Sequence, residues 1–187
     1  IAVGRVLFYW APAMWRLVNF YERCLARYPR VTKASLGGGL AATGDVAAQR
    51  IERRESFDRH RFVSFTSFGV LWTGLFNHYW YGWLARRVPG ASVAAVIQKA
   101  LWQHAFLNPF IYLPFFYCYQ GTTLQLSVEE VGEKARAEYI PTITRLWSIW
   151  IPTALVMFRF VPERHQVLLT AGVNFLWNTV LSLTYNS

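Results

Sequence analysis

The stretch FVSFTSFGVLWTGLFNHYWYGWLA, residues 62–85, runs for 24 residues without one formally charged side chain. An α-helix rises 1.5 Å per residue, so about 20 mostly apolar residues cross the roughly 30 Å hydrocarbon core of a bilayer. Backbone polar groups in lipid must pair within their own segment, which favours a helix. Residues 62–85 therefore predict a membrane-spanning helix.

Other stretches of the chain share this lack of charge. Residues 100–128 and residues 165–187 contain no Asp, Glu, Lys or Arg, although proline interrupts the first of them. Residues 146–158 are uncharged but short, and they extend back to Ile140 if Arg145 reaches the interface with its long side chain. Each of these stretches predicts a further apolar helix.

Residues 32–49 are less apolar because they contain Asp45, but small residues recur along them at helical spacing. They are Gly37, Ala41, Gly44 and Ala48. A face of small residues lets two helix backbones approach closely in lipid. We expect a helix-packing face, with a passage lined by backbone as the alternative.

Two segments are amphipathic. In residues 6–27 an apolar stripe recurs every three or four residues and the arginines fall on the opposite face, which is typical of a helix lying along a membrane surface. Residues 127–138 are densely charged, and Ser127 followed by Glu130 fits a capping box. This second segment predicts a charged interfacial helix.

The composition agrees with a membrane protein. Apolar residues make up 54% of the 187 residues, charged residues only 16%, and there are nine Trp, a residue that favours the membrane interface. The net charge of +9 lies between the apolar stretches, where it suits anionic lipid. Candidate contacts to lipid head groups are Arg53, Arg54, Arg61, Arg86 and Arg87. Lys and Arg divide almost evenly between the two sides, so no orientation is predicted.

These features together predict an all-α fold. We expect residues 1–187 to form a single membrane domain, a multi-pass transmembrane bundle of four to five apolar helices with amphipathic interfacial helices at 6–27 and 127–138.

Some polar residues within the apolar helices are candidates for the lining of a polar interior or pore. Asp45 and Gln49 are one helical turn apart on one face, and the others are His78, Gln103 and His104. Charged groups inside a membrane usually face the interior of the bundle. The alternative for each residue is a buried, hydrogen-bonded anchor without a functional role.

No enzymatic chemistry is predicted. The chain has no nucleophile elbow, no phosphate-binding loop and no cluster of Cys and His spaced for a metal, so we expect neither a metal nor another cofactor. The basic loop at 50–61 lacks the interleaved aromatic residues of a single-strand binding platform. We therefore expect no nucleic-acid partner.

The chain resembles the Mpv/peroxisomal-membrane-protein family, small four-helix proteins of the mitochondrial inner membrane and the peroxisomal membrane. The resemblance extends from about Trp15 to Ser182. The matching motifs are Tyr28-Pro29, Gly44-Asp45, Gln49, Asp58, Arg59, Arg61, Gly74, His78, Trp80-Tyr81, Val161-Pro162 and Trp177. The resemblance implies the mitochondrial inner membrane as location, with the peroxisomal membrane as the alternative.

The chain also departs from the family pattern at several polar positions. Gln103-His104 stands where the family has Asp-Gln, Met157 stands where it has Asn, and Ala154 stands where it has Gln. A passage that depends on these residues would have lost much of its lining, whereas packing against neighbours needs only the shape of the bundle.

We therefore expect a non-enzymatic membrane protein that is a structural or accessory subunit of a larger inner-membrane complex. Its partners would be membrane lipid, including anionic lipid, and other membrane-protein subunits. The alternative is a channel or transporter for small solutes, which is the activity that the resemblance implies.

Overall fold

The structure, a computed structural model, describes residue 16, residues 18–52 and residues 56–185. Within these residues the fold is all-α, as expected. Residues 18–27 are helical, and the elements that follow are α2 (Pro29–Ile51), α3 (Arg59–Phe68), η1 (Gly69–Phe76), α4 (Asn77–Arg87), α5 (Val93–Leu101), η2 (Trp102–Tyr112), α6 (Leu113–Thr123), α7 (Val128–Phe160) and α8 (Glu163–Tyr185).

The elements η1 and η2 are π-helical segments that join α-helices without interrupting the rod. Gly69, the first residue of η1, and Asn77, the residue after it, both keep right-handed helical dihedral angles. Residues 59–87 are therefore one continuous helical rod, which confirms the helix predicted for 62–85. Residues 93–123 form a second rod, shifted towards the N-terminus from the predicted 100–128, because Gln125 adopts a positive φ of 58° in the turn that follows.

The charged segment 127–138 is not a separate helix. Ser127 and Glu130 form the predicted capping box, but α7 then continues for 33 residues through Pro141 and Pro152. The buried side chains Thr142, Ile143 and Leu146 keep helical spacing along this stretch, so packing carries the helix through the first proline.

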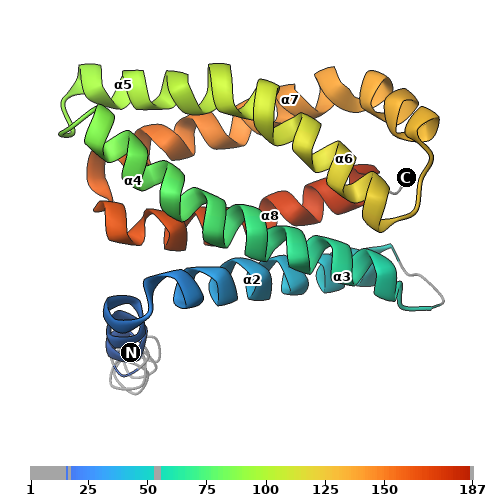
Figure 1. Cartoon of the computed structure of the whole chain (residues 1–187), viewed down its shortest axis with the longest axis horizontal. Helices are drawn as coiled ribbons and strands as arrows, with labels where there is room; N and C mark the ends of the chain where they lie inside the picture. The colour runs from blue at the N-terminus through green and yellow to red at the C-terminus, as the bar shows by residue number, and fades with distance from the viewer. Residues whose placement is uncertain (1–15, 17, 53–55, 186–187) are drawn as a thin grey trace, which may run out of the picture.

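The rods pack side by side (Figure 1). One side of the molecule is built by α2, which contacts α3, η1 and α8, and the other side by α5 and α6 packed on α7. Aromatic residues from α3, η1, η2 and α6 form one part of the core around Phe68, Trp72 and Phe116. A second apolar cluster joins α4, α5, α7 and α8 around Leu84 and Val167.

Among the described residues, no single helix combines the length and the apolar content needed to cross a membrane. Of the amphipathic segment predicted for 6–27, residues 6–15 and 17 lie outside the described part. Its remainder is helical and contacts α8 through Glu22, whose carboxylate lies 3.2 Å from His165 Nε2.

Candidate functional site

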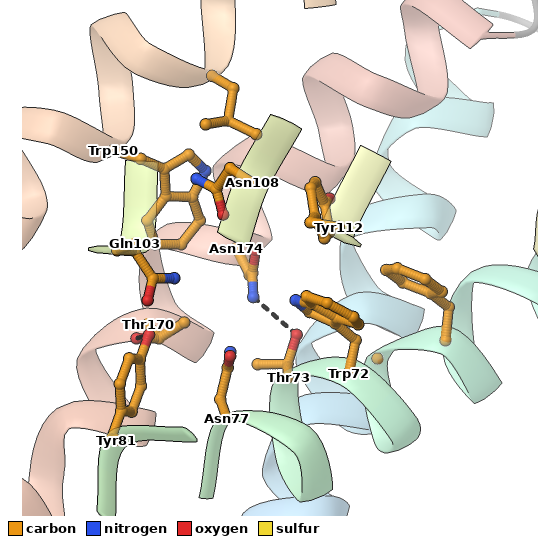
Figure 2. A pocket seen from close by; sticks show the side chains of 13 residues that line it. Trp72, Thr73, Asn77, Tyr81, Gln103, Asn108, Tyr112, Trp150, Thr170 and Asn174 are labelled. Atoms are coloured by element: carbon orange, nitrogen blue, oxygen red, sulfur yellow. Dashed lines mark hydrogen bonds between the residues drawn. The ribbon is translucent and has the colours of Figure 1, made fainter. Parts of the chain in front are cut away.

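A small polar cavity lies inside the bundle between η1, α4, η2, α7 and α8 (Figure 2). Its volume of about 30 Å³ is enough for about two water molecules. None of the residues that line it is formally charged. The amide and hydroxyl side chains in the lining are Thr73, Asn77, Gln103, Asn108, Thr170 and Asn174, together with Tyr81 and Tyr112.

Four of these eight polar side chains are hydrogen-bonded to one another, three bond to residues outside the lining, and Asn77 differs from both groups. Asn174 Nδ2 donates to Thr73 Oγ1 at 2.7 Å, and Tyr81 Oη lies 2.9 Å from Thr170 Oγ1. Asn77 is buried and its Oδ1 has no hydrogen-bond partner. Because a buried carbonyl without a partner is costly, this oxygen is an acceptor available to a molecule inside the cavity.

Of the residues predicted to line a polar interior, Gln103 lies at this cavity, where its Oε1 accepts a hydrogen bond from Trp80 Nε1. His104 follows it on η2 but is not part of the cavity lining. Its Nδ1 lies 2.9 Å from Nδ2 of Asn108, which does line the cavity, and His104 also borders an apolar groove on the outside of the bundle.

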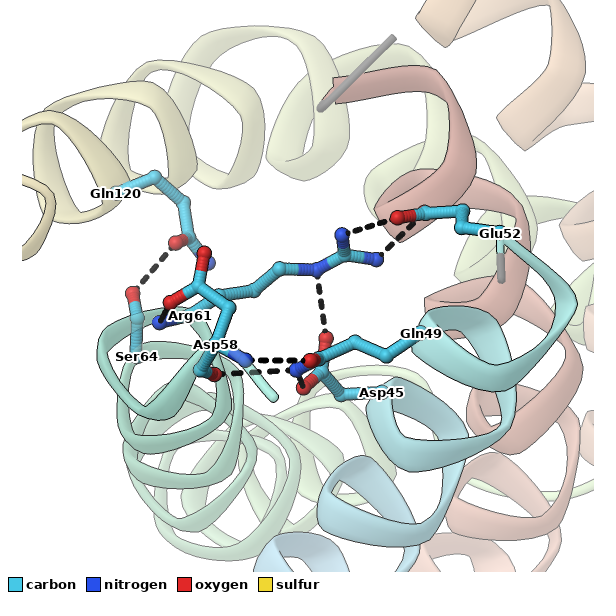
Figure 3. Close-up of polar contacts among 7 residues, drawn as sticks. All are labelled: Asp45, Gln49, Glu52, Asp58, Arg61, Ser64 and Gln120. Carbon is cyan, nitrogen blue, oxygen red and sulfur yellow. Dashed lines mark hydrogen bonds and ion pairs between the residues drawn. The ribbon is translucent and has the colours of Figure 1, made fainter. Parts of the chain in front are cut away.

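Asp45 and Gln49 do not lie at the cavity. They belong to a separate polar network that ties α2 to α3 (Figure 3). Arg61 Nε donates to Asp45 Oδ1 at 2.9 Å, and the two terminal nitrogens of Arg61 bind both oxygens of Glu52 at 2.7 and 2.8 Å. Gln49 Nε2 donates to Asp45 Oδ2 at 2.7 Å.

Asp58 joins the same network and starts α3. Its side chain caps the helix by accepting a hydrogen bond from the backbone of Arg61, while its own backbone N–H donates to Gln49 Oε1 at 2.8 Å. Such a cap satisfies a free N–H of the first helical turn. The network therefore fixes where α3 begins relative to α2.

This geometry corrects the prediction that Arg61 contacts lipid head groups. Its side chain is fully buried and is held by two carboxylates, so it is not presented to a bilayer surface. Arg86 and Arg87 are exposed at the end of α4, whereas Arg53 and Arg54 lie outside the described residues.

His78 lies apart from both the cavity and the Asp45 network. Its Nδ1 is 3.0 Å from Nζ of Lys33, a lysine of α2 with only 5% of its surface exposed. The five residues predicted to line one polar interior thus lie in four different places, and only Gln103 is at the cavity.

The small residues Gly37, Ala41, Gly44 and Ala48 are all buried along α2. A Cβ atom added to Gly37 would lie 2.6 Å from the carbonyl oxygen of Gly69 in η1, which is backbone and has little freedom to move. This face therefore serves close backbone packing against η1 rather than the lining of the described cavity.

Most of the cavity-lining residues were missed from the sequence. They are neutral asparagines and threonines inside apolar stretches, and sequence reasoning gave weight to charges and histidines instead. Asn77, Asn108 and Asn174 each stand among apolar or aromatic neighbours. A rule that flags every amide within an apolar helix would have found them.

An apolar groove of about 290 Å³ lies on the outer surface between the 93–123 rod and α7. It is lined by Ile97, Ala100, Leu101, His104, Ala105, Trp147, Ile151 and Leu155. Exposed apolar surface of this kind suits contact with lipid chains or with a partner helix.

Comparison with known proteins agrees with the resemblance seen in the sequence. The model of the Mpv17 / PMP22 family matches residues 122–182. The mitochondrial inner membrane protein Mpv17 of Danio rerio is 27% identical over 176 residues, which cover 92% of this chain and 97% of that protein. Peroxisomal membrane protein 2 of Bos taurus is 26% identical over 91% of this chain and 90% of its own length. No solved structure matches the chain.

The names of these relatives support the mitochondrial inner membrane as the location, with the peroxisomal membrane as the alternative. The similarity extends well beyond the part that the family model matches, since the relatives align over about nine tenths of the chain. Over most of its length the chain is therefore similar to proteins of the Mpv17 / PMP22 family.

Proposed function

We propose that this protein is a non-enzymatic, multi-pass membrane bundle that provides a gated passage for small neutral polar solutes. The observation that carries the proposal is the cavity itself. Amide and hydroxyl groups from separate rods converge on one interior space, and no charged residue lines it. Polar groups inside a membrane bundle are costly and commonly mark a substrate pathway.

Two features support the placement in a membrane. The continuous rods 59–87 and 93–123 are longer than the roughly 20 residues that a bilayer requires, and large apolar side chains such as Phe106, Phe110 and Phe115 are exposed along the second rod. In water such surfaces would be unfavourable, whereas in lipid they match the solvent.

The polar interior survives the departures from the family motif. Positions where the family has polar residues are apolar at Ala154 and Met157, yet Asn77, Asn108 and Asn174 supply amides to the same bundle. The departures therefore leave a polar interior in place, which favours the passage over the accessory role.

Room for about two waters makes this a closed state, so solute passage requires the cavity to widen. The walls η1 and η2 are π-helical, and such segments are frequent at functional sites. Widening would separate η1 from the rods that face it across the cavity. A neutral lining selects against ions, because it offers no countercharge when an ion loses its hydration shell.

The test is solute flux in liposomes that contain the purified full-length protein. We expect swelling in an osmotic gradient of a small neutral polyol to fall at least tenfold in Asn77→Leu, which blocks the cavity and removes its free acceptor. The matched control is Gln98→Leu, since Gln98 is an exposed amide on α5. Equal flux in Asn77→Leu, Gln98→Leu and unaltered protein, or flux no faster than in empty liposomes, would overturn the passage.

A second candidate function is that of an accessory subunit in a larger membrane complex, and the apolar groove on the 93–123 rod and α7 favours it. A partner helix lying in this groove would cover Leu101, Trp147 and Leu155. Solubilisation in a mild detergent followed by native gel electrophoresis tests it. Comigration with a large complex in fixed stoichiometry supports the subunit role, and migration alone or as a small homo-oligomer contradicts it.

A further inference from the structure

The packing of the rods segregates charge between the two ends of the bundle. One end combines residues 16–33, 82–99 and 159–165, because the starts of α2, α5 and α8 meet the ends of α4 and α7 there (Figure 1). We call it the basic end. Its sequence contains ten Lys or Arg and only two acids, Glu22 and Glu163.

The opposite end is nearly balanced. It combines the end of α2, the start of α3 and the start of α7, which carries Glu129, Glu130, Glu133 and Glu138 against Lys134 and Arg136. Nearly all of the net charge of +9 therefore lies at the basic end, where it attracts anions.

A buried cation lies within the basic end. Lys33 is 5% exposed, and among the described residues no carboxylate lies within 4 Å of its Nζ, which instead lies 3.0 Å from His78 Nδ1. The ammonium group donates to this ring nitrogen, which must then be unprotonated. Glu163 acts on this charge only from a distance. A buried cation without an anion in direct contact is costly, so the site favours binding of an anion.

Two further cations lie at the basic end, and one of them, Arg30, acts electrostatically on the His78 ring that Lys33 contacts. The Arg30 guanidinium lies over the ring of Tyr79, 5.9 Å from its centroid. Beside Gly82, Arg86 Nη1 and Glu163 Oε1 lie 3.5 and 3.2 Å from the position that a Cβ atom would take. Glu163 is the one carboxylate that this part of the basic end contains, and it is exposed.

Apolar side chains are exposed at and beside the basic end, and one of them, Tyr79, contacts Arg30. Val31 is 64% exposed, Tyr79 56%, Val93 68% and Phe160 74%. Cations beside exposed apolar groups match an amphipathic ligand, with a phosphate on the cations and chains along the apolar surface. A free phosphate ion would use only the first of these two features.

We propose that the basic end binds the anionic head groups of membrane phospholipids, and that one head-group phosphate is held by Lys33, Arg30 and Arg86. This inference rests on the membrane placement in the proposed function, but it does not depend on solute passage. It replaces the lipid contact predicted at Arg61 with a cluster at the other end of the bundle.

Native mass spectrometry of the full-length protein in detergent tests the proposal, with phosphatidylglycerol, phosphatidylcholine and inorganic phosphate added separately. We expect phosphatidylglycerol to bind at least tenfold more tightly than phosphatidylcholine. Arg30→Gln and Arg86→Gln should each weaken phosphatidylglycerol binding about fivefold, which corresponds to about 1 kcal/mol for each basic residue near an anionic surface. Both side chains are exposed, so neither substitution should disturb folding.

Lys33→Met should cause at least the same loss, and its elution on size exclusion checks that it is folded. The matched control is Arg136→Gln, an exposed arginine near the start of α7 at the opposite end. Unchanged phosphatidylglycerol binding in Arg30→Gln and Arg86→Gln, or an equal loss in Arg136→Gln, would overturn the site. Displacement of the lipid by millimolar inorganic phosphate would overturn the lipid assignment in favour of a free-phosphate site. Loss of solute flux in the liposome assay leaves this binding measurement unaffected, so the two proposals fail separately.

Discussion

Replacement of Arg61 by Met should be among the most destabilising single changes in α3. The substitution keeps an unbranched side chain but removes the guanidinium that pairs with Asp45 and Glu52. Asp45 is fully buried, whereas the side chain of Glu52 keeps 17% exposure and so retains part of its hydration. Breaking a buried ion pair costs about 3–5 kcal/mol, and the partial hydration of Glu52 places the expectation near 3 kcal/mol, over a hundredfold in the folded-to-unfolded ratio.

Unfolding by titration of sodium dodecyl sulfate into mild-detergent micelles, followed by tryptophan fluorescence, measures this difference. Asp45→Asn should cost less than Arg61→Met, because an amide oxygen still accepts from Arg61 Nε and Glu52 still balances the guanidinium. Arg59→Met is the control, since Arg59 is exposed two residues earlier. If Arg61→Met and Arg59→Met unfolded within about 0.5 kcal/mol of each other, the network would not hold α2 to α3 as inferred.

Three further substitutions test other parts of the structure by the same unfolding assay. Gly37→Ala should destabilise the protein by about 1–3 kcal/mol because the added Cβ meets the backbone of η1. Gly39→Ala, whose added Cβ would have nothing within 4 Å, should be neutral or stabilising. The reverse order of the two variants would contradict the packing face. Ser127→Ala should lower the free energy of unfolding by about 1 kcal/mol because it removes the cap of α7, and an unchanged free energy of unfolding would contradict the capping box. Hydrogen bonds from the Ser127 backbone and hydroxyl lower the pKa of Glu130. The contribution of Glu130 to stability is therefore complete above its unfolded pKa and is lost as the pH falls through the lowered folded value. Glu130→Gln should remove this part of the acid sensitivity, and the control Glu129→Gln should retain it.

The polar family signature gains a physical meaning from the structure. From the sequence, Gln49 was predicted to line a polar interior and Arg61 to contact lipid head groups, and Asp58 was given no role beyond its place in the family motif. They instead form a single network at one end of the bundle, where the loop between α2 and α3 brings them together. Such a network sets the register between two helices, and this role requires all of its residues to be present at the same time.

The cavity was the least predictable part of the protein. Gln103 was expected to face a polar interior and lies at the cavity, but its neighbours there come from rods as distant in sequence as Thr73 and Asn174. Helical periodicity shows which residues share a face of one helix. It contains no information on which face of another helix lies opposite, so the composition of an interior site needs the tertiary contacts.

The sequence by itself determined the helices, because an uncharged run of 24 residues and a Ser127–Glu130 cap act over a few turns of one chain segment. It also indicated the resemblance to the family, through motifs that keep their order and spacing. Only the tertiary structure decided the partner of each polar group: Asp45 binds Arg61, and Lys33 meets His78 across 45 positions. The same holds for the segregation of charge, since Lys and Arg appeared almost evenly divided until the packing of the rods gathered the acids at one end. Contacts between distant segments decide which partner a polar group has and at which end of the bundle a charge lies. The local spacing of residues does not encode these contacts.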